Sequence, residues 1–300
     1  MIDYTIKLTF TTPMFGHGAT DEPEIRPSSI RGQLHSWFRL LGGTIDQERA
    51  VFGGIRQGKG QYKTHDETMA SRVVVRVTNV KGMVDEVETL PHKFGNRAAP
   101  RKAYKAGTTC EVRVTDRLGG IKESADEELF VRALQAWLLM GTLGFRSTRA
   151  AGSFVWECVS FPMPTDVEAY RAACVDVLLD APARFGILPR VYSREDVAAA
   201  RRLVSDSLGG PDNLDERNDL QELHNPLGCI KPSRKTSPLK YRIICCGNDY
   251  RILALWDGRE DVTGNTASDL QGVIDLLGWR KPELGGLLKN SDLYVDNEES

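Results

Sequence analysis

The sequence predicts an α+β protein: a ferredoxin-like (RRM-like) β-α-β-β-α-β domain over residues 1–161, followed by a helix-rich domain over residues 162–300. Two observations support this prediction. The first half alternates β-branched segments with two amphipathic helical segments in the ferredoxin-like order, and prolines at 162 and 164 mark its end. The signals are weaker after that point. No internal repeat is visible, so a second, decorated ferredoxin-like unit in the second half stays an open alternative.

The first strand and first helix have the clearest patterns. Residues Ile2 to Phe10 alternate with period two, as a half-buried strand does. After a loop rich in Gly and Pro, Ser28 or Ser29 is expected to cap a helix that ends before Gly42. The helix is indicated by apolar residues that share one face: Ile30, Leu34, Trp37, Phe38 and Leu41.

The other elements of the first half follow in order. Two segments rich in β-branched residues predict strands, and a basic loop lies between them. A segment with acidic residues in its first turn and apolar residues at helical spacing predicts the second helix, and a last strand follows it. The predicted ranges are Arg72–Val80, Thr108–Thr115, Glu123–Met140 and Ser153–Phe161.

The second half is predicted to contain three helices and a hairpin with its turn at Gly247-Asn248-Asp249. A long segment before the hairpin lacks periodicity and is expected to be a loop. The helices are predicted at Asp166–Leu179, Arg194–Leu208 and Thr266–Leu277, the hairpin at Leu239–Trp256 and the loop at Gly209–Lys235.

Composition narrows the function classes. The longest apolar runs fall well short of the roughly 20 residues that cross a bilayer, and the N-terminus does not resemble a secretory signal, so we expect a cytoplasmic protein without membrane contact. The six cysteines form no C-x-x-C pair and the five histidines no H-E-x-x-H spacing. We therefore expect neither a metal site nor disulfides, and no cofactor.

The charge is uneven along the chain. The formal net charge is −2, but residues 1–160 carry 22 Lys and Arg against 18 Asp and Glu, whereas residues 161–300 carry 17 against 23. If one half contacts a polyanion, it is the first, and the acidic second half is expected to face protein partners.

The most informative stretch is Gly141 to Gly152, G-T-L-G-F-R-S-T-R-A-A-G, between the second predicted helix and the last strand. Its glycines let the backbone approach a polyanion, and Arg146 and Arg149 offer forked donors that match phosphate oxygens. The stretch lacks the G-K-[ST] of a Walker loop. The alternative is an ordinary connection with two solvated arginines.

Two further groups of basic residues could contact RNA. One is a stripe four residues apart along the edge of the first helix, Arg31, His35 and Arg39, with Arg26 just before the helix. The other is the acid-free segment His92 to Lys105, in which Phe94 and Tyr104 could stack on bases. Its cations are Lys93, Arg97, Arg101, Lys102 and Lys105. For both groups the alternative is a solvated surface.

His35 could also make the protein a ribonuclease. Metal-independent RNA cleavage needs a general base near a 2′-hydroxyl and a cation on the phosphate, which Arg31 or Arg39 would supply. The sequence places no second acid or base beside His35, so catalysis is the alternative and binding the main hypothesis.

Two motifs resemble a known family. Gly144, Arg146, Arg149 and Gly152 match the glycine-rich loop of the RAMP superfamily, although Thr142 and Ala150 stand where glycine is usual. The segment P-E-I-R-P-S-S-I-R-G-Q-L-H-S-W-F-R and the later V-F-G-G resemble the opening of the first subunit of the Cmr, or type III-B, CRISPR effector. The second resemblance departs at His35, where arginine is more usual.

The resemblance implies an architectural subunit of a CRISPR ribonucleoprotein that takes part in antiviral defence. It would bind guide RNA, and possibly target RNA, beside other RAMP subunits. Because guide sequences vary, its contacts should fall on phosphates and sugars. The resemblance covers residues 1–160 well and the remainder thinly.

Overall fold

Strand β1 (Asp3–Phe10) lies in the middle of a four-stranded antiparallel sheet with the order β4-β7-β1-β8. The computed structural model describes residues 2–17, 22–56, 67–117, 119–207, 214–223, 225–227 and 237–285. Alternate residues of β1 are buried beneath the helices. The partner strands are β4 (Val73–Lys81), β7 (Thr109–Asp116) and β8 (Phe154–Glu157). This is the ferredoxin-like order, and the predicted fold class is confirmed.

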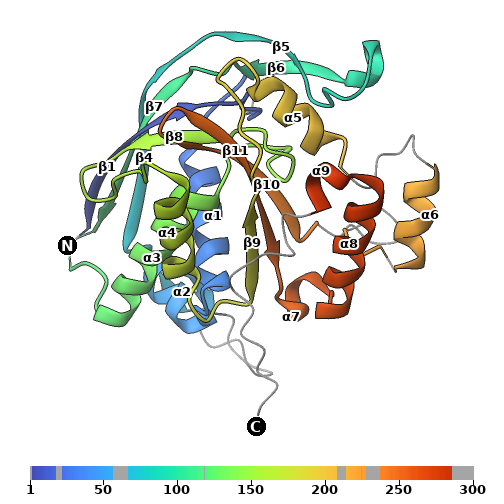
Figure 1. Cartoon of the computed structure of the whole chain (residues 1–300). Helices are drawn as coiled ribbons and strands as arrows, with labels where there is room; N and C mark the ends of the chain where they lie inside the picture. The colour runs from blue at the N-terminus through green and yellow to red at the C-terminus, as the bar shows by residue number, and fades with distance from the viewer. Residues whose placement is uncertain are drawn as a thin grey trace.

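Helices α1 (Pro27–Leu40) and α3 (Ser124–Met140) pack side by side on one face of this sheet (Figure 1). The apolar stripe of α1 is buried as its spacing predicts, with Leu34 and Phe38 fully enclosed. The expected capping by Ser28 or Ser29 is wrong. Pro27 occupies the first turn, where its fixed φ suits a helix, and Arg26 is the N-cap residue without a side-chain cap.

A short helix that the sequence pattern did not predict follows α1. Helix α2 (Ile45–Phe52) begins with a capping box in which the side chains of Thr44 and Gln47 cap each other's backbone N–H groups. Its last two residues, Val51 and Phe52, are buried. Helix α2 leads into a small hairpin, β2 (Gly54–Arg56) and β3 (Glu67–Met69).

The basic segment His92–Lys105 is not the loop that we expected. It contains a 3-10 turn (Gly95–Ala98) and strand β6 (Pro100–Tyr104), which pairs with β5 (Val84–Glu88) in a separate antiparallel hairpin. The pairing sets acidic against basic residues, with Glu86 directly opposite Lys102. Opposite charges across a ladder stabilise it, and this partnership cannot be seen in the basic segment alone.

The second sheet has the order β10-β11-β9 and is also antiparallel. Its strands are β9 (Ala183–Ile187), β10 (Leu239–Cys246) and β11 (Asp249–Asp257), so the predicted hairpin is present with Gly247 at positive φ in its turn. Together with α5 (Val197–Ser205) and α8 (Ala267–Arg280), the chain order is β-α-β-β-α. These are the first five elements of a ferredoxin-like unit.

Of the remaining helices, one packs against α3 and the other three lie near α8 (Figure 1). Helix α6 (Leu214–Glu222) lies inside the segment Gly209–Lys235 that we expected to be a loop; the other parts of that segment fall largely outside the described residues. The sequence pattern did not predict this helix because its sequence is polar. Ion pairs from Arg280 and Lys281 stabilise the helix, which lacks a broad apolar face. The others are α4 (Val167–Leu178), α7 (Glu260–Thr263) and α9 (Pro282–Gly285).

A buried arginine joins the two sheets. The guanidinium of Arg242 on β10 donates to the backbone carbonyls of Gly141 (2.7 Å) and Phe154 (2.6 Å), and it lies 4.4 Å from the Phe154 ring centroid. The largest apolar core likewise includes residues from both sides of position 161. No helix in the described ranges has both the length and the apolar character needed to cross a bilayer.

Candidate nucleic-acid interface

Glycines fix the path of the segment between α3 and β8. Gly144 has φ +92, and a Cβ there would lie 2.1 Å from the carbonyl oxygen of Phe15. Gly152 has φ +66, and a Cβ there would lie 1.8 Å from the carbonyl oxygen of Leu143. Only glycine fits both positions, so these residues give the loop its shape.

The two arginines of this loop have different surroundings. Arg146 has φ +59 and an exposed side chain. Arg149 points inward: its guanidinium donates to the Ser207 hydroxyl, and its burial lowers the pKa of Arg149. The loop also pairs with β10, where the Tyr241 N–H donates to the Thr148 carbonyl (3.2 Å). Arg149 therefore ties the loop to the residues after Val204, and Thr148 ties it to the second sheet.

A small apolar cluster joins the loop to the β5–β6 hairpin. Phe15, which follows β1, packs against Ala103 of the hairpin and Ala151 of the loop. The ring of Phe145 lies 5.2 Å from that of Phe15, measured between centroids. Val87 of β5 packs against the same cluster. Two stretches that the sequence analysis singled out separately thus form one surface.

The hairpin offers two kinds of cation. Lys102 and Lys105 pair with acids, Lys102 with Glu22 and Lys105 with Asp85 at 3.3 Å. Arg97 and Arg101 are exposed and have no hydrogen-bond or ion-pair partner among the described residues. Because side chains alternate along a strand, Arg101 shares the face of Ala103, which is the face turned toward the glycine-rich loop.

The aromatic residues of the hairpin also differ. Phe94 is 82% exposed beside the basic turn. Tyr104 instead exchanges backbone hydrogen bonds with Met14 and packs against the core. Only Phe94 of the two is free to stack on a partner. Lys93 lies next to Phe94 and is half-buried.

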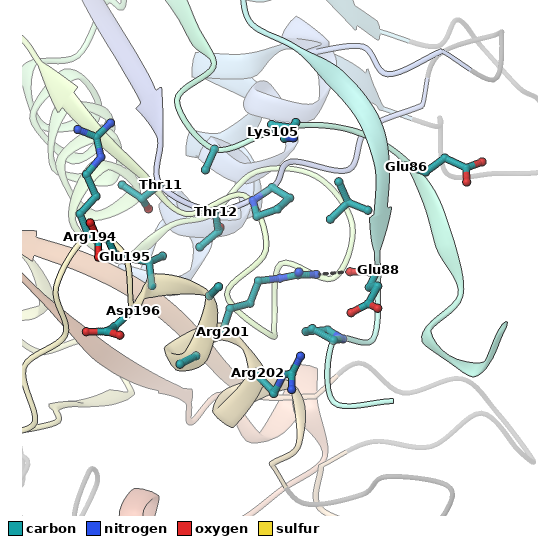
Figure 2. A pocket seen from close by; sticks show the side chains of 17 residues that line it. Thr11, Thr12, Glu86, Glu88, Lys105, Arg194, Glu195, Asp196, Arg201 and Arg202 are labelled. Atoms are coloured by element: carbon teal, nitrogen blue, oxygen red, sulfur yellow. Dashed lines mark hydrogen bonds between the residues drawn. The ribbon is translucent and has the colours of Figure 1, made fainter. Parts of the chain in front are cut away.

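A cavity of about 800 Å³ opens between the hairpin, the segment after β1, and α5. Figure 2 shows Arg201 reaching from α5 through this pocket toward Glu88, with Lys105 above it and Arg202 below it in that view. The Arg201 guanidinium donates to the Glu88 carbonyl (2.9 Å), and burial lowers its pKa to about 10. Arg202 and Arg194 line the cavity and are exposed.

The basic stripe on α1, which consists of Arg31, His35 and Arg39, lies against α2. Arg31 donates to the carbonyl of Phe52, at the C-terminal end of α2. His35 Nδ1 lies 2.7 Å from Glu48 Oε1, and Arg39 Nε lies 3.8 Å from Glu48 Oε2. Burial lowers the pKa of His35, although the bond to Glu48 opposes this shift. Within the described part of the chain, no hydrogen bond or ion pair links this group to the loop or the hairpin.

Sequence reasoning missed several residues of these sites. Glu48 was overlooked because α2 was not predicted, although T-x-x-Q at its start is a capping signature. Arg194, Arg201 and Arg202 were assigned only to a helix, and no sequence signal shows that this helix faces the hairpin. Across the described residues, no three His, Cys, Asp or Glu side chains gather to hold a metal ion.

The fold and loop define a ferredoxin-like protein with a glycine-rich connection before the last strand of its first sheet. The family model of the RAMP superfamily matches residues 7–155, and the chain belongs to this superfamily. No curated protein sequence matches the chain.

The chain shares its fold with several solved structures of low sequence identity. Cmr1 from Pyrococcus furiosus in its apo form is 17% identical, with a TM-score of 0.52 over 85% of this chain and 88% of that one. A chain of the type III-B Cmr-beta complex bound to cognate target RNA is 11% identical, with a TM-score of 0.53 over 85% and 94% of the two chains.

Proposed function

We propose that this protein is an RNA-binding architectural subunit of a type III CRISPR effector, where it contacts guide RNA or the guide–target duplex during antiviral RNA interference. Membership of the RAMP superfamily supports this proposal, as does the fold shared with a chain from a target-bound type III-B complex. Other RAMP subunits would be its protein partners, and it would work in the cytoplasm.

The observation that carries the proposal is the apolar cluster of Phe15, Ala103 and Ala151, because it holds two basic elements together. Arg146 of the loop and Arg97 and Arg101 of the hairpin are exposed on these two elements, and we call these three residues the loop–hairpin surface. Guanidinium groups form forked hydrogen bonds with phosphate oxygens. Such contacts are independent of base sequence, as a guide-binding protein requires.

The other predicted site residues take supporting roles in this proposal. Gly144 and Gly152 shape the loop, and Arg149 anchors it through Ser207. Lys93, Lys102 and Lys105 add positive charge along the hairpin, and Arg26 adds an exposed charge at the start of α1. Phe94 would stack on an unpaired base, a contact worth roughly 1 to 3 kcal/mol.

The domain assignment is part of the proposal. Residues 1–161 would form the RNA-binding unit, and residues 162–300 a second RAMP-like unit whose acidic surface faces other subunits. The β-α-β-β-α order around the second sheet supports this assignment. The shared core and Arg242 would hold the two units in one orientation.

An endoribonuclease is the second candidate, and the His35–Glu48 pair favours it. Glu48 orients the imidazole through Nδ1, as carboxylates orient histidine bases in enzymes, and the lowered pKa leaves His35 unprotonated at neutral pH. Incubation of the pure protein with labelled repeat RNA, with and without a chelator, tests this candidate. Specific cleavage that His35→Ala abolishes would establish it; intact RNA would exclude it for that substrate.

The main proposal is tested by purifying the protein from its host and sequencing the RNA that accompanies it. We expect RNAs with one shared flank and varied remaining sequence, together with other RAMP proteins. A mock purification from cells with an untagged copy is the control. RNA indistinguishable from this control would contradict the proposal.

A further inference from the structure

Arginines face one another twice across strands β4 and β7. Arg76 of β4 is directly opposite Arg113 of β7. The same register continues past the strand ends, where the Arg117 N–H donates to the Arg72 carbonyl (2.8 Å) and sets these residues opposite each other. Val74 and Thr115 form the pair between them. All three pairs lie on the sheet face opposite the helices, since alternate residues share a face.

Like charges directly opposite in a ladder destabilise it. Only Arg113 has an acidic partner, because Asp3 accepts its Nε and one terminal nitrogen at 3.0 and 2.9 Å. In the described ranges, the side chains of Arg72, Arg76 and Arg117 have no hydrogen-bond or ion-pair partner. The sheet therefore holds three cations close together that lack an ion-pair partner among the described residues, in a protein whose net charge is −2.

These three arginines line a hollow of about 570 Å³. Its residues lie at the end of the sheet where β1 begins, because the Asp116 N–H donates to the Ile2 carbonyl (3.0 Å), whereas the hairpin and the glycine-rich loop bond to residues that follow β1. An eight-residue strand spans roughly 27 Å. The hollow is thus a separate place on the first sheet. Asp116 also lines it and accepts the Ile2 N–H at 3.2 Å.

We propose that this hollow is a second binding site for the sugar-phosphate chain of single-stranded RNA. The inference rests on the proposed function for the identity of the ligand. Arg72, just before β4, and Arg76 within it are four residues apart in extended chain, or about 13 Å, so a polymer with an anion on every unit can reach both arginine pairs at once. None of the described residues that line the hollow is aromatic, so its arginines would contact phosphates, and such contacts carry no information about base sequence.

The test compares RNA binding by the full-length protein and its variants in filter binding across a salt series. Arg76→Ala with Arg117→Ala removes two exposed cations from the hollow. Lys7→Ala with Lys122→Ala is the matched control, because it removes the same charge, and Lys7 lies on the same sheet but is already paired with Glu157 (2.7 Å). We expect about tenfold weaker binding of the hollow variant, and a salt slope flattened by about 1.4 for two lost phosphate contacts.

Thermal unfolding provides a second readout. Removal of repelling charges should leave the melting temperature of the hollow variant at or above that of the control variant, so that weaker binding cannot come from a damaged fold. Equal affinity and salt slope in the two variants would overturn the inference. The inference would also be overturned if polyglutamate displaced all RNA from the hollow and RNA could not displace polyglutamate. An acidic protein segment would then be the favoured ligand.

Failure of this inference is distinguishable from failure of the proposed function. If Arg146→Ala weakens RNA binding and the hollow variant does not, the proposed function stands and the second site is rejected. If the hollow variant alone weakens binding, the hollow is supported and the loop is removed from the interface. If the wild-type protein binds RNA no better than a neutral control protein, both are rejected.

Discussion

His35 on α1 and Glu48 on α2 form a hydrogen-bonded pair, with 2.7 Å between Nδ1 and Oε1. The imidazole also lies over the Phe52 ring, with 3.8 Å between the ring centroids. These two contacts fix the orientation of the ring and leave Nδ1 committed to the carboxylate. The pair can either position His35 for a phosphate or support it as a general base.

The first prediction separates these two roles. If His35 only contacts a phosphate, His35→Ala should weaken RNA binding by about 1 kcal/mol without changing target cleavage by the intact complex at saturating concentration. Glu48→Gln is the companion variant, because it keeps the shape and removes the charge. A loss of a hundredfold or more in single-turnover cleavage in either variant would favour the ribonuclease.

The second prediction concerns pH. Because burial lowers the pKa of His35 in the folded protein, the unfolded chain binds more protons between that pKa and about 6.5. Stability therefore rises with pH in this window and is lost on acidification through it. We expect the free energy of unfolding to fall more between pH 7.5 and 5.5 in the wild type than in His35→Gln. Parallel profiles in urea denaturation would contradict this expectation.

The third prediction concerns the junction between the sheets. Arg242→Leu keeps the apolar bulk but leaves the carbonyls of Gly141 and Phe154 without their donor, so it should destabilise the fold by about 2 to 4 kcal/mol. Arg190→Leu, at an exposed arginine in the same half, should change stability by less than about 0.5 kcal/mol. Equal midpoints of urea unfolding for the two variants would show that Arg242 does not hold the sheets together.

The fourth prediction separates the two loop arginines. Arg149 is partly buried and bound to Ser207, whereas Arg146 is exposed. Arg146→Ala should weaken RNA binding and leave the melting temperature nearly unchanged. Arg149→Met should leave RNA affinity within about twofold when measured below its melting temperature, because the Arg149 guanidinium is bound to Ser207 within the fold. A greater loss of affinity in Arg149→Met than in Arg146→Ala would reverse these assignments.

The sequence predicted the elements whose periodicity is long and unbroken. Helices α1 and α3 and strands β1 and β7 were found within a few residues of their observed bounds, because each buries one regular face. Helix α2 has only eight residues, which is too few for a clear period. The β5–β6 hairpin was not predicted, because its basic strand is stabilised by acidic residues on another segment.

The candidate site shows the same limit. Arg146 and Arg149 are three residues apart and identical in type, and only the folded structure shows that Arg146 is exposed and that Arg149 is partly buried and bound to Ser207. Gly144 and Gly152 were predicted correctly as loop glycines. Both have positive φ, a conformation that glycine adopts more readily than other residues. The facing arginines of β4 and β7 are distant in sequence, and their register depends on the whole sheet.

The central claim is that the loop–hairpin surface holds RNA by its phosphates. The most direct measurement is filter binding of single-stranded RNAs of unrelated sequence by Arg97→Ala/Arg101→Ala/Arg146→Ala across a salt series, with Lys7→Ala/Lys122→Ala/Arg190→Ala as the matched control. We predict equal weakening for every sequence and a salt slope flattened by about 2, at roughly 0.7 per lost contact. Affinity and slope equal to those of the control variant would contradict the claim.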